Sequence, residues 1–122
     1  MFTIQNELLK VTVAPNGAEL QSVQRIDTSM EYMWSGDEKF WGKKSPVLFP
    51  IVGGLKNNSY TYNGKRYELG RHGFARDRIF TVSAQSESNI TFELKSDKES
   101  LFIYPFNFLF NITYSLNKNK LT

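Results

Sequence analysis

The chain has 122 residues, 15 of them basic and 12 acidic, with a formal charge of +3, no cysteine and one histidine. So small and evenly spread a charge argues against a nucleic-acid partner, and the lack of cysteine excludes a disulfide framework and thiolate chemistry. A single histidine argues against a zinc site and no phosphate-loop motif is present, so we predict neither a metal nor a cofactor. Ten phenylalanines and six tyrosines, with many β-branched residues, favour an all-β fold.

The chain shows no signal for export or for insertion into a membrane. Its first residues, Met1 to Glu7, lack the basic and apolar regions of a secretory signal. No stretch approaches the roughly 20 apolar residues that a membrane helix needs. We therefore expect a cytoplasmic protein with no membrane partner.

The first part of the chain predicts one hairpin. Apolar and polar residues alternate over 9–13, Pro15-Asn16-Gly17 turns the chain, and residues 18–23 are expected to pair back onto the first strand. Residues 31–34 are then predicted to form a short aromatic strand, and residues 38–42 are compatible with one helical turn.

Residues 45–55 differ in composition from the rest of the chain. Two prolines and two glycines bracket the apolar run Val47-Leu48-Phe49. Proline fixes φ and removes a backbone donor, so this segment is not expected within a sheet. We predict that it crosses one end of the sheet and walls a pocket.

Four further strands and a helical turn are predicted downstream. Asn63-Gly64 is a strong two-residue hairpin signal, and Asp97–Leu101 is compatible with a single helical turn before Pro105. The alternating strands pair as two hairpins, and they are expected at 60–62, 66–69, 80–84 and 90–94.

The last predicted strand, 106–116, alternates strictly and presents a row of aromatic residues on one face. The chain turns at Asn117 and ends soon after, which leaves this strand with an unprotected edge. We therefore expect self-association through that edge and interpret the chain as part of a longer protein. Overall we expect more than half of the residues in β-structure and no helix longer than two turns.

The polar cluster of the chain is Arg71-His72-Gly73-Phe74-Ala75-Arg76-Asp77. Imidazole can both donate and accept hydrogen bonds, and the planar guanidinium group donates several of them. His72 and Arg76 could therefore bind hydroxyls or an anion. An inert loop histidine and an Arg76–Asp77 ion pair are equally compatible with the pattern. For Trp34, Trp41 and Phe74, core packing is favoured over a stacking platform for a sugar ring.

Three motifs in this order resemble the aldose 1-epimerase (galactose mutarotase) family, and its LacX-type branch in particular: 46–53, 60–67 and 72–77. The resemblance implies that residues 1–122 are the N-terminal part of a single antiparallel β-sandwich domain of the galactose mutarotase-like supersandwich type. It also implies an isomerase of carbohydrate metabolism that interconverts the α and β anomers of an aldohexose or its phosphate.

In that family a histidine and a glutamate are the acid and base, and His72 matches a different histidine, which holds the substrate. The resemblance thus implies a small-molecule sugar as partner, no catalytic residue in this chain, and substrate-binding roles for His72, Arg76, Phe74 and Lys56. LacX-type proteins often carry a basic residue where this chain has Gly54, so Lys56 or Arg76 would replace its sugar contact.

Two other functions stay open on the residues alone. One is a non-catalytic carbohydrate-binding β-sandwich module, which needs no acid or base and would bind both anomers. The other is a β-barrel that binds single-stranded nucleic acid through stacked aromatic residues, with an affinity that falls steeply with salt.

Overall fold

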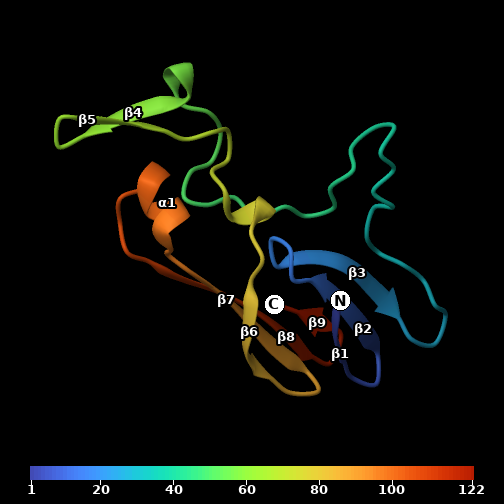
Figure 1. The fold of residues 1–122 in the computed structure, drawn as a ribbon. Coiled ribbons are helices and arrows are strands. Elements are labelled where there is room, and N and C mark those ends of the chain that lie inside the picture. The colour runs from blue at the N-terminus through green and yellow to red at the C-terminus, as the bar shows by residue number, and fades with distance from the viewer.

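Two antiparallel sheets and a separate hairpin make up the computed structural model, which describes residues 1–122 (Figure 1). The first sheet has the order β1-β2-β3, the second the order β6-β7-β8-β9, and the hairpin is β4-β5. The strands are β1 (Phe2–Gln5), β2 (Leu9–Ala14), β3 (Glu19–Arg25), β4 (Ser59–Tyr62), β5 (Lys65–Glu68), β6 (Thr81–Gln85), β7 (Asn89–Lys95), β8 (Leu109–Asn117) and β9 (Lys120–Leu121). The helical elements are η1 (Lys56–Asn58), η2 (Ala75–Asp77) and α1 (Lys98–Ile103), and none is long and apolar enough to cross a membrane.

The core lies between the two larger sheets. Period-two alternation turns the apolar side chains of β2 and β7 to the same interior, and Val11 and Phe92 are fully buried there. Phe2 of β1 packs edge-on against Phe92 of β7, with ring centroids 5.7 Å apart. Ten buried residues from both sheets and the η2 region share this core: Ile4, Leu9, Val11, Val13, Ala18, Ala75, Phe80, Ile90, Phe92 and Leu116.

The β4-β5 hairpin projects beside α1, away from the two larger sheets (Figure 1). Asn63 and Gly64 both have positive φ, which is the geometry that a two-residue turn of this kind requires. Tyr60 donates its hydroxyl to the carbonyl of Ile103 at 2.7 Å and so ties the hairpin to α1. The helix begins at Lys98, and the side chain of the preceding Asp97 caps it by accepting from the backbone N–H of Ser100.

The predicted hairpins, the helical turn after Asp97 and the all-β class are confirmed. Strand accounts for 43% of the residues, so the expectation of more than half is wrong, while the longest helix has six residues, as expected. The last strand starts at Leu109 rather than at 106. The strand β1 was missed because only four residues support it.

Residues 31–34 form no strand, and that prediction is wrong. Only an isolated bridge between Gln24 and Glu31 remains. The carboxylate of Glu31 accepts from the backbone N–H groups of Val23 and Met33, each at 2.9 Å, so it takes donors that a regular ladder would have used.

Candidate functional site

The loop that carries His72 is held by residues 45–55, a segment that forms no strand. The carbonyl of Phe49 accepts from the backbone N–H groups of Phe74 at 2.9 Å and Ala75 at 3.2 Å. Gly73 has φ +71, and a Cβ there would lie 2.1 Å from the Phe49 carbonyl oxygen. Only glycine therefore permits this close approach, which fixes the loop from within its own motif.

His72 and Gly53 exchange two hydrogen bonds. The backbone N–H of His72 donates to the Gly53 carbonyl at 2.7 Å, and the backbone N–H of Gly53 donates to Nδ1 of the imidazole at 2.8 Å. The imidazole is half-buried, and its Nε2 lies 3.3 Å from Nε of the exposed Arg71. The ring is therefore oriented by backbone, with its Nε2 edge toward Arg71.

Arg76 is brought to the same loop as His72. Its Nη2 donates to the carbonyl of Arg71 at 3.2 Å, and its Nε lies 3.7 Å from Asp77. Asp77 is also 3.6 Å from Nζ of Lys43, so one carboxylate is shared by two cations. The predicted Arg76–Asp77 ion pair thus exists, but at a distance too long to occupy the guanidinium fully.

Two residues outside the predicted site, Gly17 and Glu19, position this loop. A Cβ on Gly17, which has φ +70, would lie 2.8 Å from the Arg76 carbonyl oxygen, so the β2-β3 turn packs directly against η2. Glu19 is 5% exposed, and its Oε1 accepts from the backbone N–H groups of Lys44 at 2.6 Å and Ser45 at 2.9 Å. That buried carboxylate fixes the segment that carries Lys43. No local signal could have found it, because its partners lie 25 residues downstream.

Phe74 lies in an aromatic cluster and is 8% exposed. Its ring packs edge-on against Phe49, which is itself stacked on Phe110 with centroids 4.4 Å apart. The guanidinium of Arg78 lies 5.9 Å from the centre of the Phe74 ring. These contacts engage Phe74 in packing and leave little of its ring for a ligand.

The other expected binding and aromatic residues lie apart from this loop or face solvent. Lys56 is exposed in η1 and makes no hydrogen bond or ion pair with His72 or Arg76. Trp34 is 40% exposed and Trp41 52% exposed, so the prediction that they pack in the core is wrong. Both follow β3 in the irregular stretch before residue 45.

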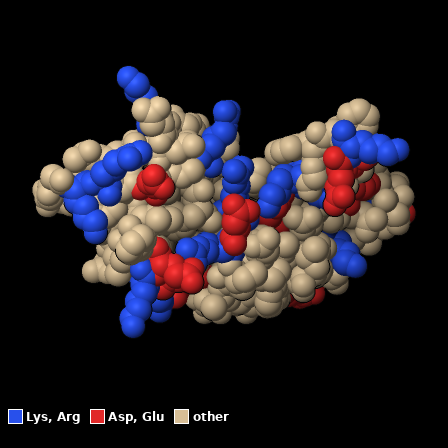
Figure 2. Space-filling view, turned by 45° about the horizontal axis from the view of Figure 1, so that its top comes forward, with Lys and Arg blue, Asp and Glu red and all other residues tan.

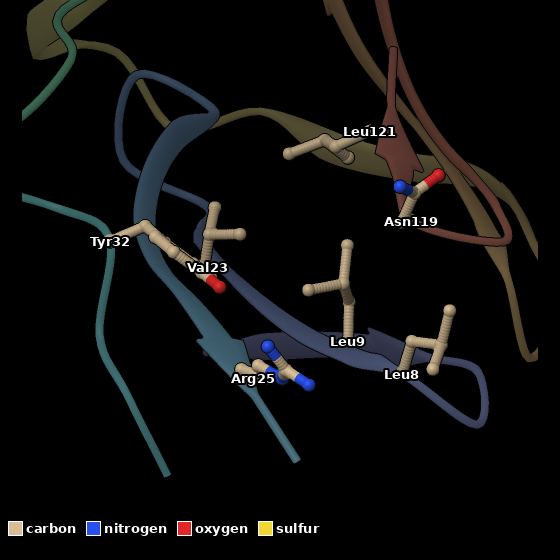
Figure 3. A pocket seen from close by; sticks show the side chains of 7 residues that line it. All are labelled: Leu8, Leu9, Val23, Arg25, Tyr32, Asn119 and Leu121. Carbon is tan, nitrogen blue, oxygen red and sulfur yellow. The ribbon is translucent and has the colours of Figure 1, made fainter. Parts of the chain in front are cut away.

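None of the four cavities is lined by His72 or Arg76. The largest, about 560 Å³, lies where β2 and β3 face β9, and Figure 3 shows Leu9 and Val23 directed across it toward Leu121. The segment 45–55, expected to wall a pocket, lines no cavity. Basic and acidic side chains alternate over the face in Figure 2, without a large field of one sign.

Two ionisable groups near the loop have altered pKa values. Burial raises the pKa of Tyr114, and the charge of Glu19 raises it further, so its hydroxyl stays protonated and donates to the Ala18 carbonyl at 2.8 Å. The backbone N–H of Ser100 lowers the pKa of Asp97, and Arg78 contributes to the same shift. Neither group forms a hydrogen bond with His72, so both stabilise the scaffold around the loop.

Residues 1–122 match the sequence pattern of the family described as Aldose 1-epimerase. The chain belongs to the aldose 1-epimerase family. Two LacX proteins of Lactococcus lactis subsp. lactis, one from a plasmid and one chromosomal, are each 34% identical over 119 residues, which is 93% of this chain and 40% of theirs. The chain therefore spans about 40% of the length of these relatives.

Solved structures agree with the family assignment. A galactose mutarotase related enzyme from Lactobacillus acidophilus is 48% identical, with a TM-score of 0.96 over 98% of this chain and 40% of its own. A galactose mutarotase-like protein from Lactobacillus casei is 40% identical, with a TM-score of 0.94 over 99% of this chain and 41% of its own. In this member of the family, the expected galactose mutarotase-like β-sandwich architecture is thus confirmed.

Proposed function

We propose that this chain supplies the sugar-binding part of an aldose 1-epimerase that interconverts the α and β anomers of an aldohexose or its phosphate. The observation that carries the proposal is the convergence of His72 and Arg76 on one glycine-fixed loop, where Arg76 bonds the Arg71 carbonyl and His72 is held by Gly53. A rigid loop with an imidazole and a guanidinium suits the ordered hydroxyls of a sugar.

Anomer exchange opens the hemiacetal ring, so it needs a base for the anomeric hydroxyl proton and an acid for the ring oxygen. His72 is the only histidine, and Nδ1 is already engaged by the Gly53 N–H. We therefore assign His72 to substrate orientation, together with Arg76. The acid and the base are assigned to residues outside these 122, with Lys56 as a further candidate for a substrate contact.

A chimera tests this assignment. The matched 40% of the Lactobacillus acidophilus relative is replaced by the present chain, and optical rotation of freshly dissolved α-glucose, α-galactose and their 6-phosphates is followed. We expect the chimera to accelerate anomer exchange wherever the intact relative does, and the 122-residue chain alone to behave like buffer. Loss of an acid or base costs about 10²–10⁴-fold in rate.

His72→Ala in the chimera separates orientation from proton transfer. If His72 orients the substrate, KM rises and kcat changes little. A loss confined to kcat would assign His72 to proton transfer, and acceleration by the 122-residue chain alone would contradict the assignment of both groups elsewhere. Binding of both anomers by an inactive chimera, with an active parent, would instead favour a non-catalytic carbohydrate-binding module.

A second proposal concerns assembly through β8. Its inner edge pairs with β7, but its outer edge is bonded to β9 only around Leu116–Asn117, which leaves Leu109–Tyr114 without a partner on that side. An open edge with exposed Leu109 is a template for another strand. We propose that the 122-residue chain self-associates there. A strict monomer in sedimentation at high concentration would contradict this.

A further inference from the structure

The hydrogen bonds of His72 determine which of its nitrogens carries the proton. A neutral imidazole has one N–H donor and one acceptor nitrogen. The backbone N–H of Gly53 lies 2.8 Å from Nδ1 and has to donate to it, because a backbone amide cannot accept there. The proton of the neutral ring is therefore on Nε2, and His72 presents a donor at its Nε2 edge.

The proton on Nε2 affects how His72 interacts with the neighbouring arginine, Arg71. Nε of Arg71 lies 3.3 Å from Nε2 of His72, and guanidinium nitrogens only donate. The Nε–H of Arg71 is directed at Nε2, but a neutral ring that accepts from Gly53 at Nδ1 cannot also accept at Nε2, so two N–H donors meet there without an acceptor. An oxygen at the apex of a triangle on these two nitrogens would accept from both at ordinary hydrogen-bond distances of about 2.8–3.0 Å.

The charges around this donor pair favour an oxygen that carries negative charge. Arg71 forms no ion pair, while Arg76 and Lys43 share the single carboxylate of Asp77 at 3.7 and 3.6 Å. The connected cluster therefore holds three fixed cations and one carboxylate. Charge-assisted hydrogen bonds are roughly twice as strong as neutral ones, so this surplus selects an anionic acceptor over a hydroxyl.

We infer that Arg71 is a further substrate-binding residue, which together with the Nε2–H of His72 holds an anionic oxygen, either phosphate or carboxylate, of an acidic aldose. The inference rests on the proposed function and narrows its substrate class. Arg71 acts as the specificity determinant and His72 as its partner donor.

The first measurement is the tautomer of His72 in the 122-residue chain. A long-range ¹H–¹⁵N spectrum distinguishes a protonated Nε2 from a protonated Nδ1, and a single histidine makes the assignment unambiguous. We expect the Nε2–H form at neutral pH. A protonated Nδ1 in the neutral ring would remove the donor pair and overturn the inference.

The second measurement is binding of four probes, followed through the His72 Nε2 signal, which every variant retains: galactose, galactose 6-phosphate, galacturonate and inorganic phosphate. We expect the two acidic sugars to bind more tightly than galactose, and Arg71→Gln to weaken both by roughly tenfold or more. Arg66→Gln is the matched control, because it removes the same charge from the exposed hairpin strand β5, where Arg66 pairs with Glu68 at 3.7 Å.

The outcomes separate this inference from the proposed function. Equal binding of galactose and both acidic sugars, unchanged by Arg71→Gln, would overturn the inference and leave a sugar site. Inorganic phosphate binding as tightly as galactose 6-phosphate, with loss in Arg71→Gln, would support the anionic acceptor while contradicting a sugar function. An equal loss in Arg66→Gln, or no response to any acidic probe, would overturn the inference.

Discussion

The two-sheet core and the scaffold of the His72 loop are stabilised in opposite ways. In the core, large side chains such as Phe92 and Phe80 fill the space between the sheets. Around the loop, residues 45–55 and 70–77 include no strand, and backbone groups meet directly through glycine. The core therefore depends on the presence of side chains, whereas the loop depends on the absence of one. A buried core tolerates substitutions that conserve side-chain volume, whereas a close backbone contact tolerates no added side chain.

The largest effect is expected in the core. Phe92→Ala removes a fully buried ring that packs against Phe2 at 5.7 Å and Tyr114 at 6.3 Å between centroids. We expect a loss of about 3–5 kcal/mol in the free energy of unfolding, measured by urea denaturation. The control is Phe40→Ala, the same substitution at a ring that is 81% exposed, which should change stability by less than about 0.5 kcal/mol. Similar losses in both variants would mean that the two sheets do not form a common core.

In the loop, adding a single methyl group should be nearly as harmful. Gly73→Ala places a Cβ 2.1 Å from the Phe49 carbonyl oxygen at a φ of +71, so we expect a loss of at least about 2 kcal/mol. Urea denaturation measures the loss, and the His72 signals in NMR report whether the loop has moved.

Two neighbouring glycines serve as controls for Gly73. Gly53 has φ +81 but nothing within 4 Å of its Cβ position, so Gly53→Ala isolates the backbone strain, about 1 kcal/mol. Gly54 has neither a positive φ nor a neighbour, so Gly54→Ala should cost less than about 0.5 kcal/mol. Equal costs at all three positions would contradict the close contact with Phe49.

The same contrast explains what the sequence could and could not predict. Ile90 and Phe92 revealed their strand by alternation, and Asn63-Gly64 revealed its turn, because both signals are local. The contacts of Gly73 with Phe49 and of Glu19 with Lys44 join segments distant in the chain, and no local pattern records them. The sequence named His72 and Arg76 as a pair, but the role of Arg71 needed the position of the Gly53 N–H.

Glu19 allows a smaller test of the scaffold. Glu19→Ala leaves the partly buried N–H groups of Lys44 and Ser45 without their acceptor, and we expect a loss of about 1–3 kcal/mol by urea denaturation. Both donors use the same oxygen, Oε1, so Glu19→Gln retains an acceptor and should recover most of this loss. A glutamine variant as unstable as the alanine variant would show that the charge, rather than the acceptor, stabilises residues 43–45.

The smallest effect is expected at α1, the short helix whose first turn Asp97 caps. Asp97 accepts from the backbone N–H of Ser100 at 2.7 Å, and Ser100 Oγ accepts from the backbone N–H of Asp97 at 2.8 Å. Asp97→Ala should cost about 1 kcal/mol near pH 7 in urea denaturation. Asp97→Asn keeps a capping oxygen and should cost less.

The pH dependence of the Asp97 cap distinguishes the carboxylate from other contacts of this segment. The backbone N–H of Ser100 lowers the pKa of Asp97 in the folded chain below its ordinary value of 3.8, with Arg78 contributing. The ionised carboxylate therefore stabilises the fold fully above that ordinary value, and this stabilisation is lost as the pH falls through the lower folded pKa. The stability difference between the wild type and Asp97→Ala should accordingly shrink below about pH 4. The difference between Asp97→Asn and Asp97→Ala should stay constant there, because neither side chain titrates. A wild-type advantage that persists unchanged down to pH 2 would show that the cap does not depend on the charge.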